Sequence, residues 1–289
     1  MKNVIIVLTF FGLWLSTQLN PVVQDYVAYA LILTFGVLHG ANDITLIKSL
    51  PSENQSNKYT LLRYIGAVAF VSILFLMSKS LALLFFILIS GYHFGEQHFG
   101  NAMRSETRLA LPFYLSYGLV VLFMVFALQL NEVVLIIEDI AGVTLSTSFF
   151  TFGLLSVAIC FIGLGLFLYL KSHLKINPLK ELFYLGVLAL VFANASLVWG
   201  FAIYFIFWHS LPSLNDQLGF LYGKATKNTF LRYLKSSSIY WLASILGLTL
   251  MYLLLKDQVD FFITVVLYIL AAITFPHVLV MSKVEALKK

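Results

Sequence analysis

About ten apolar stretches, each near the length that crosses a bilayer as a helix, dominate this chain of 289 residues. A helix needs roughly 20 residues to cross about 30 Å of hydrocarbon. Only 11% of the residues are charged, whereas an ordinary soluble domain carries about 25%. We therefore predict an all-α protein, a polytopic transmembrane helix bundle in the lipid bilayer. The predicted spans are 4–19, 26–43, 60–77, 81–98, 109–130, 149–170, 182–197, 199–215, 238–256 and 259–281.

The basic residues support this count and give an orientation. With ten spans, 16 of the 18 Lys and Arg residues fall on the side of the N-terminus, and only Lys79 and Lys256 fall on the other. Cytoplasmic loops carry an excess of Lys and Arg, so both termini are predicted to be cytoplasmic. Merging the weakest pair, 182–197 and 199–215, would scatter the charges. The prediction is a multi-pass protein of the cell membrane, and the net charge of +5 implies no nucleic-acid partner.

The first span stands apart from the rest. Residues 1–25 are predicted to form an extra N-terminal transmembrane helix, with a signal anchor as the alternative. No small-residue cleavage pattern follows it, although such a pattern is expected after a signal peptide. A retained helix is therefore favoured, and cleavage stays an open question. The single cysteine, Cys160, excludes an internal disulfide and a cysteine-based metal cluster.

Five of the six histidines lie on even-numbered spans. Even spans all run toward the cytoplasm, and each of these histidines lies in the later part of its span, so all five share one depth. Imidazoles delivered to one layer by separate helices are what a metal centre in a bundle core requires. An all-nitrogen site near lipid suits iron among other metals. The predicted metal ligands are His39, His93, His209 and His277.

Neighbouring residues refine this prediction. His93 and His98 are about 140° apart on a regular helix, so both cannot bind one metal. Asp43 follows His39 by four residues and is a candidate to hold a ligand's second ring nitrogen, or equally to close the helix at the interface. Glu96 and His98 are further candidates for a supporting or alternative ligand.

Glycine and proline near the histidines predict local features of the backbone. Gly91, Gly95 and Gly100 favour close helix packing or a local bulge. Pro276 directly precedes His277 and predicts a loosened backbone in the last span.

Four short motifs carry a resemblance: His39-Gly40-Ala41-Asn42-Asp43, His93-Phe94-Gly95, His209-Ser210 and Pro276-His277. In this order on membrane spans, they resemble the Brp/Blh family of bacterial and archaeal β-carotene 15,15'-dioxygenases. The resemblance covers residues 26–289. It implies an Fe(2+)-dependent membrane enzyme that uses O2 to split β-carotene, or a related carotenoid, at its central double bond. The product would be retinal, with a microbial rhodopsin as its acceptor.

The resemblance places the family's iron ligands at His39, His93 and His209, with no catalytic residue beyond the ligands. The family's fourth histidine corresponds to Ser213 here, so His277 or His98 would have to replace it. This departure keeps a non-catalytic carotenoid-binding or rhodopsin-assembly protein open. Another metal-dependent lipid oxidase is the remaining alternative, although the clustered histidine boxes typical of such enzymes are absent. The metal, the preferred carotenoid and the oligomeric state stay open.

Overall fold

The computed structural model describes residues 2–50, 57–105, 107–255 and 262–287. These ranges are helical except for connections and a single bridge between Met103 and Leu174. The main helices are α1 (Lys2–Gln18), α2 (Pro21–Leu31), α3 (Val37–Gly40), α4 (Asp43–Lys48), α5 (Asn57–Met77), α6 (Lys79–Phe99), α7 (Ala110–Leu128), α8 (Leu130–Ala141), α9 (Thr147–Leu170), α10 (Pro178–Asn194), α11 (Leu197–Ile203), α12 (Leu211–Tyr222), α13 (Lys227–Leu255) and α14 (Phe262–Ala286).

Six helical runs within the described ranges are long and apolar enough to cross a membrane. They are Pro21–Lys48, Ala110–Leu128, Thr147–Leu170, Leu197–Tyr222, Lys227–Leu254 and Phe262–Ala286, and Leu61–Met77 is a shorter apolar helix. These runs indicate a multi-pass helical membrane bundle, as predicted. That all ten predicted segments cross the membrane, with both termini in the cytoplasm, stays a prediction.

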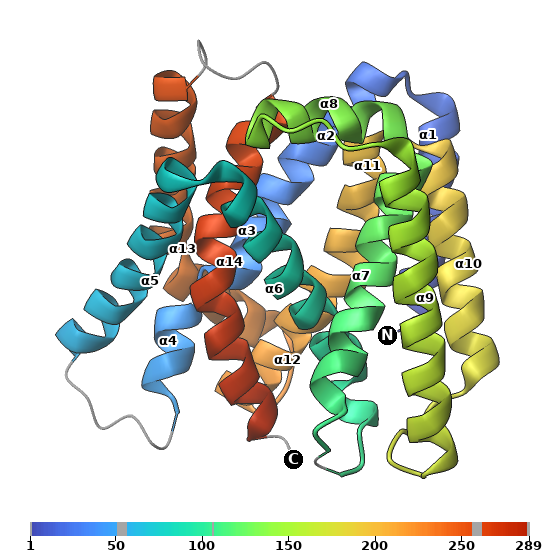
Figure 1. Ribbon diagram of the computed structural model, residues 1–289. Helices are drawn as coiled ribbons and strands as arrows, with labels where there is room; N and C mark the ends of the chain where they lie inside the picture. Colours follow the sequence, from blue (N-terminus) through green and yellow to red (C-terminus); the bar gives the residue numbers. More distant parts are fainter. Residues whose placement is uncertain (1, 51–56, 106, 256–261, 288–289) are drawn as a thin grey trace.

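Segments predicted to share one side of the membrane lie at one end of the bundle. The α6–α7 and α9–α10 connections pair there, with the Arg104 N–H donating to the His173 carbonyl at 2.8 Å. Lys2 lies 3.5 Å from Glu181 in the first turn of α10, so α1 begins at this end, where α14 also ends (Figure 1). Lys256, Lys288, Lys289 and the predicted span ends at 256 and 259 lie outside the described residues.

The weakest predicted division, between α10 and α11, is a real break in the helix. Ala195 and Ser196 are extended, and the Ser196 hydroxyl accepts a hydrogen bond from the Trp199 N–H at 3.3 Å. A side chain that satisfies a free N–H in the first turn is a typical N-cap. The sequence therefore starts a new helix here.

Glycines clamp α6 against α7. A Cβ atom added to Gly95 would lie 1.9 Å from the Tyr114 carbonyl oxygen, and one on Gly118 would lie 1.9 Å from the Gly91 carbonyl oxygen. Only glycine permits backbones to approach this closely. The close packing predicted from the glycines is confirmed, and α6 stays regular through Phe99 without a bulge. His93 is held between two of these contacts.

Two π-helical segments interrupt the runs that carry His39 and His209. The first, η1 (Ile32–Gly36), precedes α3, and the second, η3 (Tyr204–Ser210), joins α11 to α12. They pack tightly, since a Cβ atom on Gly36 would lie 2.6 Å from the Phe205 ring. π-helical turns are rare and frequent at functional sites, and neither was predicted here.

Helix α8 was not predicted either. It lies across the end of the bundle opposite the termini (Figure 1) and buries Val133, Ile136, Ile137 and Ile140. This spacing places one apolar stripe on the bundle and leaves the rest of α8 outside. Gly142, with φ of 66°, ends the helix in the left-handed conformation that favours glycine.

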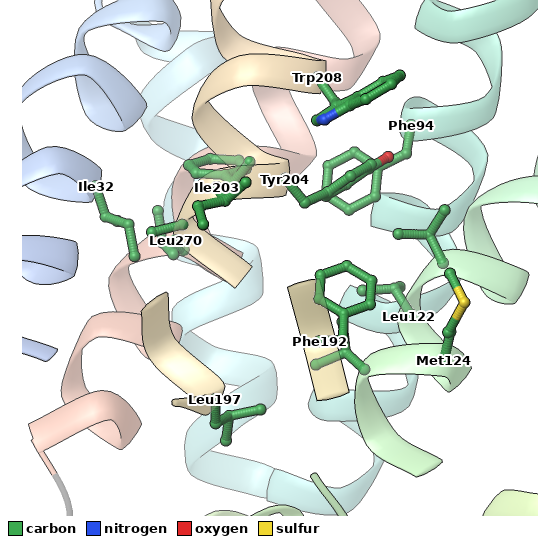
Figure 2. Close-up of a cluster of buried hydrophobic side chains, with 14 of the residues drawn as sticks. Ile32, Phe94, Leu122, Met124, Phe192, Leu197, Ile203, Tyr204, Trp208 and Leu270 are labelled. Atoms are coloured by element: carbon green, nitrogen blue, oxygen red, sulfur yellow. The ribbon is translucent and has the colours of Figure 1, made fainter. Parts of the chain in front are cut away.

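The core surrounds α11 and η3. Figure 2 shows Phe94 and Tyr204 beside each other, with ring centroids 5.2 Å apart. Trp208 of η3 donates its indole N–H to the Thr9 hydroxyl at 2.9 Å, which ties α1 to the segment that carries His209. Helices α9 and α13 bury only 11% of their apolar windows, as expected for helices at the lipid-facing rim.

Candidate functional site

Four imidazole rings form a closed cycle in the core. The centroid of His39 lies 5.1 Å from that of His209 and 4.9 Å from that of His277. The centroid of His93 lies 4.8 Å from that of His209 and 5.1 Å from that of His277. Neighbouring rings meet nearly at right angles, between 79° and 89°. The structure thus brings together the four histidines that the sequence predicts as metal ligands.

Each ring comes from a different helical run. His39 lies on α3, His93 on α6, His209 on η3 and His277 on α14, and every one is at most 5% exposed. Aromatic rings surround the cluster. The ring centroid of Phe205 lies 5.5 Å from that of His209 and 5.7 Å from that of His39, and the centroid of Phe94 lies 4.8 Å from that of His209. A polar centre is therefore sealed inside an apolar bundle.

Several imidazole nitrogens in this cluster lack any hydrogen-bond partner. Both ring nitrogens of His93, Nδ1 of His209 and Nε2 of His277 are buried and unpaired within the described structure. Buried polar atoms are normally satisfied, and an orphaned one calls for a water, an ion or another explanation. Four such atoms on three neighbouring rings are the strongest sign that this cluster receives a ligand.

Hydrogen bonds fix the tautomers of two rings. Nδ1 of His277 donates to Asp43 Oδ1 at 2.8 Å, and Nδ1 of His39 donates to the Gly36 carbonyl. A carboxylate or carbonyl only accepts, so both protons are on Nδ1 and both Nε2 atoms keep a free lone pair. This is the pattern of metal-binding histidines, whose second nitrogen is usually held by a carboxylate or carbonyl.

Asp43 therefore does hold a second ring nitrogen, but that of His277 instead of its neighbour His39. Its other oxygen accepts from the Tyr64 hydroxyl at 2.9 Å, and the residue is 1% exposed. Sequence reasoning missed Tyr64, because nothing in the chain separates it from the other 14 tyrosines.

The spacing of the rings suits a tetrahedral or planar metal centre. A metal about 2.1 Å from a ring nitrogen lies about 3.2 Å from the ring centroid, so neighbouring centroids are about 4.5 Å apart in a planar site and about 5.2 Å in a tetrahedral one. The four observed spacings, 4.8–5.1 Å, fall between these values.

The ring nitrogens themselves do not yet converge. No group of three or more His, Cys, Asp or Glu residues in the described ranges places its donor atoms where they would hold a metal ion as they stand. The ring centroids are spaced as a metal site requires, whereas the ring orientations direct the nitrogens elsewhere. The centroid lies on the Cβ–Cγ axis, so rotation about this bond redirects the nitrogens without moving a helix. Four imidazoles are a donor set that suits a metal, but holding one would require rings to turn, and only those of His93 and His209 are without a hydrogen bond at Nδ1 in the described structure.

His98 and Glu96 are engaged elsewhere. Nε2 of His98 bonds Glu181 at 2.8 Å, and Nδ1 lies 3.3 Å from the Tyr117 hydroxyl. Glu96 accepts hydrogen bonds from Tyr92 and Ser282, both at 2.6 Å. The structure brings neither side chain to the cluster as a ligand.

Ser213, where the family resemblance leads one to expect a histidine, lies one turn beyond His209. It is fully buried, and its hydroxyl accepts from Gln217 Nε2 at 3.2 Å. Gln217 also donates to the His39 carbonyl at 2.7 Å, and the Tyr233 hydroxyl donates to Gln217 Oε1 at 2.7 Å. The polar network around Ser213 thus supports the backbone of α3, and His277 supplies the fourth imidazole.

Apolar cavities adjoin the cluster. The cavity that contains the four histidines shares Phe86, Ser90, Phe94 and Phe201 with a second cavity, which α8 covers. It shares Val37, Gly40 and Ile273 with a third, which lies between α5, α13 and α14. The surroundings of the cluster therefore suit an elongated apolar molecule.

Comparison with known proteins is consistent with this site. The family model described as Beta-carotene 15,15'-dioxygenase matches residues 30–285, which include all four clustered histidines and Asp43. Neither the curated proteins nor the solved structures contain a significant match. Because the match covers most of the sequence, it confirms the family resemblance: the chain belongs to the β-carotene 15,15'-dioxygenase family.

Proposed function

We propose that this protein cleaves β-carotene, or a closely related carotenoid, at its central double bond with O2 to give retinal, using iron held by His39, His93, His209 and His277. The observation that carries this proposal is the closed cycle of four buried imidazoles, three of which have unpaired nitrogens. Family membership supplies the reaction class.

The reaction balances without a reductant. The carbon–carbon double bond breaks, and each of its two carbons takes one oxygen atom of O2. Ferrous iron, when bound, supplies O2 activation. Neutral imidazole is the ligand form that suits it.

The chain's own residues have three tasks in this reaction. Asp43 and the Gly36 carbonyl hold protons on Nδ1 of His277 and His39, which leaves both Nε2 atoms available. The rings of Phe94 and Phe205 exclude water from the cluster. The adjoining cavities hold the polyene beside it, and such positioning accounts for much of the catalysis when no acid or base is needed.

A test in cells separates the enzyme from its alternatives. Bacteria that accumulate β-carotene would express this chain or its His93→Ala variant, and their extracted pigments would be compared. Loss of β-carotene with formation of retinal, abolished by the substitution, is the expected result. Unchanged β-carotene with the protein present in the membrane would refute the activity and favour a carotenoid-binding role, while a different oxidised lipid would favour another lipid oxidase.

A further inference from the structure

The histidine cluster lies between two cavities with different walls. The cavity under α8 meets the cluster at Phe86, Ser90, Phe94 and Phe201, which are residues of α6 and α11. The groove between α5, α13 and α14 meets it at Val37, Gly40 and Ile273, which are residues of α3 and α14. Since no residue is common to both junctions, the two cavities approach the cluster from different sides.

We propose, given the function inferred above, that the polyene enters from the lipid through the α5–α13 groove and binds with one half in that groove and the other in the cavity under α8. The central double bond then lies at the histidines. Helix α8 closes the cavity beneath it and limits how deeply the polyene inserts. The depth of insertion determines which double bond of the polyene is cleaved.

The lengths agree with this placement. Leu83 lines the cavity under α8 and His93 lines the cluster, and their ten-residue separation on α6 corresponds to about 15 Å along the axis. Tyr64, which donates to Asp43 beside the cluster, and Ser72 both line the groove and are eight residues apart on α5, or about 12 Å. Together the two lengths are close to that of a forty-carbon carotenoid.

The residues that line the two cavities distinguish the closed one, under α8, from the entrance, which is the groove between α5, α13 and α14. Side chains lining the cavity under α8 are apolar except Ser90, and α8 contributes Val133, Ile136, Ile137 and Ile140 to its end. The groove is larger, about 400 Å³ against 110 Å³. Two of its wall residues, Leu61 and Ile65, are also exposed on the lipid-facing surface, by 41% and 52%. A molecule dissolved in the bilayer thus reaches the groove without crossing water.

Gly247 on α13 provides a test with little structural cost. It lines the groove, and nothing lies within 4 Å of a Cβ atom added there. Gly163 on α9 has the same open surroundings but lines none of these three cavities. Gly247→Phe therefore fills the groove, and Gly163→Phe is its matched control.

The experiment uses purified full-length protein in nanodiscs loaded with β-carotene. Bound carotenoid per chain, measured by absorbance, and retinal formed are recorded for both variants. Gly247→Phe should lower both by roughly 5- to 150-fold, which corresponds to a cost of about 1–3 kcal/mol for overpacking against the bound polyene, whereas Gly163→Phe should match the parent. If Gly247→Phe and the parent bind and cleave carotenoid equally, the proposal that the polyene binds in the groove is refuted. If the parent binds carotenoid without cleaving it and Gly247→Phe does not bind it, the groove is supported as the binding site and the proposed enzyme activity is refuted.

The role of α8 has its own readout. Ile137→Ala deepens the cavity under α8, so the polyene should insert further. Cleavage at an off-centre double bond would then yield two aldehydes of unequal length beside retinal. This product ratio is independent of how much protein folds. Retinal as the sole product of folded, active Ile137→Ala would overturn the role of α8 in selecting the bond.

Discussion

Asp43 supports the cluster through two hydrogen bonds, and its removal has a calculable effect on metal binding. Its carboxylate accepts from His277 Nδ1 at 2.8 Å and from the Tyr64 hydroxyl at 2.9 Å, at 1% exposure. Asp43→Asn keeps an acceptor for His277 but loses the charge. Hydrogen bonds to charged groups contribute about 1.5–3 kcal/mol and neutral ones about 0.5–1.5, so the loss is about 1–1.5 kcal/mol.

That loss corresponds to roughly five- to tenfold weaker iron binding. Asp43→Ala removes both hydrogen bonds and frees the His277 ring, so its effect should approach the 100-fold upper range for residues that hold a metal ligand. The order of iron affinity is expected to be parent, then Asp43→Asn, then Asp43→Ala. Iron per chain would be measured after equilibration with a graded series of chelator concentrations.

A matched control is available on α2. Asp25 accepts a hydrogen bond from Ser196 at 2.6 Å and lies at the other end of the bundle, so Asp25→Asn should leave iron affinity unchanged. Thermal melting would establish that each variant is folded. An Asp43→Ala protein that is folded and binds iron within twofold of the parent would refute the reasoning, because His277 would not need its carboxylate partner.

Two further predictions concern the packing that positions the cluster. Gly95→Ala places a Cβ atom against the Tyr114 carbonyl and should destabilise the protein by about 3 kcal/mol, the upper end of the usual cost of overpacking, whereas Gly163→Ala should not. Equal melting temperatures of the two variants in detergent would contradict the close approach of α6 and α7. Thr9→Val removes the acceptor of the buried Trp208 indole and should cost about 1–3 kcal/mol, seen as a lower melting temperature; an unchanged value would mean that α1 does not stabilise the segment carrying His209.

The arrangement of the histidines could be predicted from sequence because it depends on direction and depth alone. Alternate spans run in the same direction, so His39 and His277, far apart in the chain, were expected at one level. The 140° between His93 and His98 likewise anticipates that the two point to different neighbours. The structure agrees, with His98 paired to Glu181.

Other features depend on tertiary contacts that no local pattern reports. Asp43 was a candidate to hold a ligand's second ring nitrogen or to close the helix, and the choice of His277 on α14 follows from a turn at Ala41 and Asn42 that separates α3 from α4. The π-helical segments η1 and η3 have no signature in a single sequence. Helix α8 does have one, since its buried residues recur at i, i+3, i+4 and i+7. It was missed because only stretches long enough to cross a membrane were sought.

The identity of the fourth ligand tests the central claim most directly. Iron per chain would be measured by mass spectrometry in the purified parent, in His277→Ala and in His98→Ala. The four-imidazole cluster predicts one iron per chain in the parent, loss of iron in His277→Ala and retention in His98→Ala. Retention in His277→Ala with loss in His98→Ala, or a folded parent that binds no added iron, would contradict a metal centre built from these four histidines.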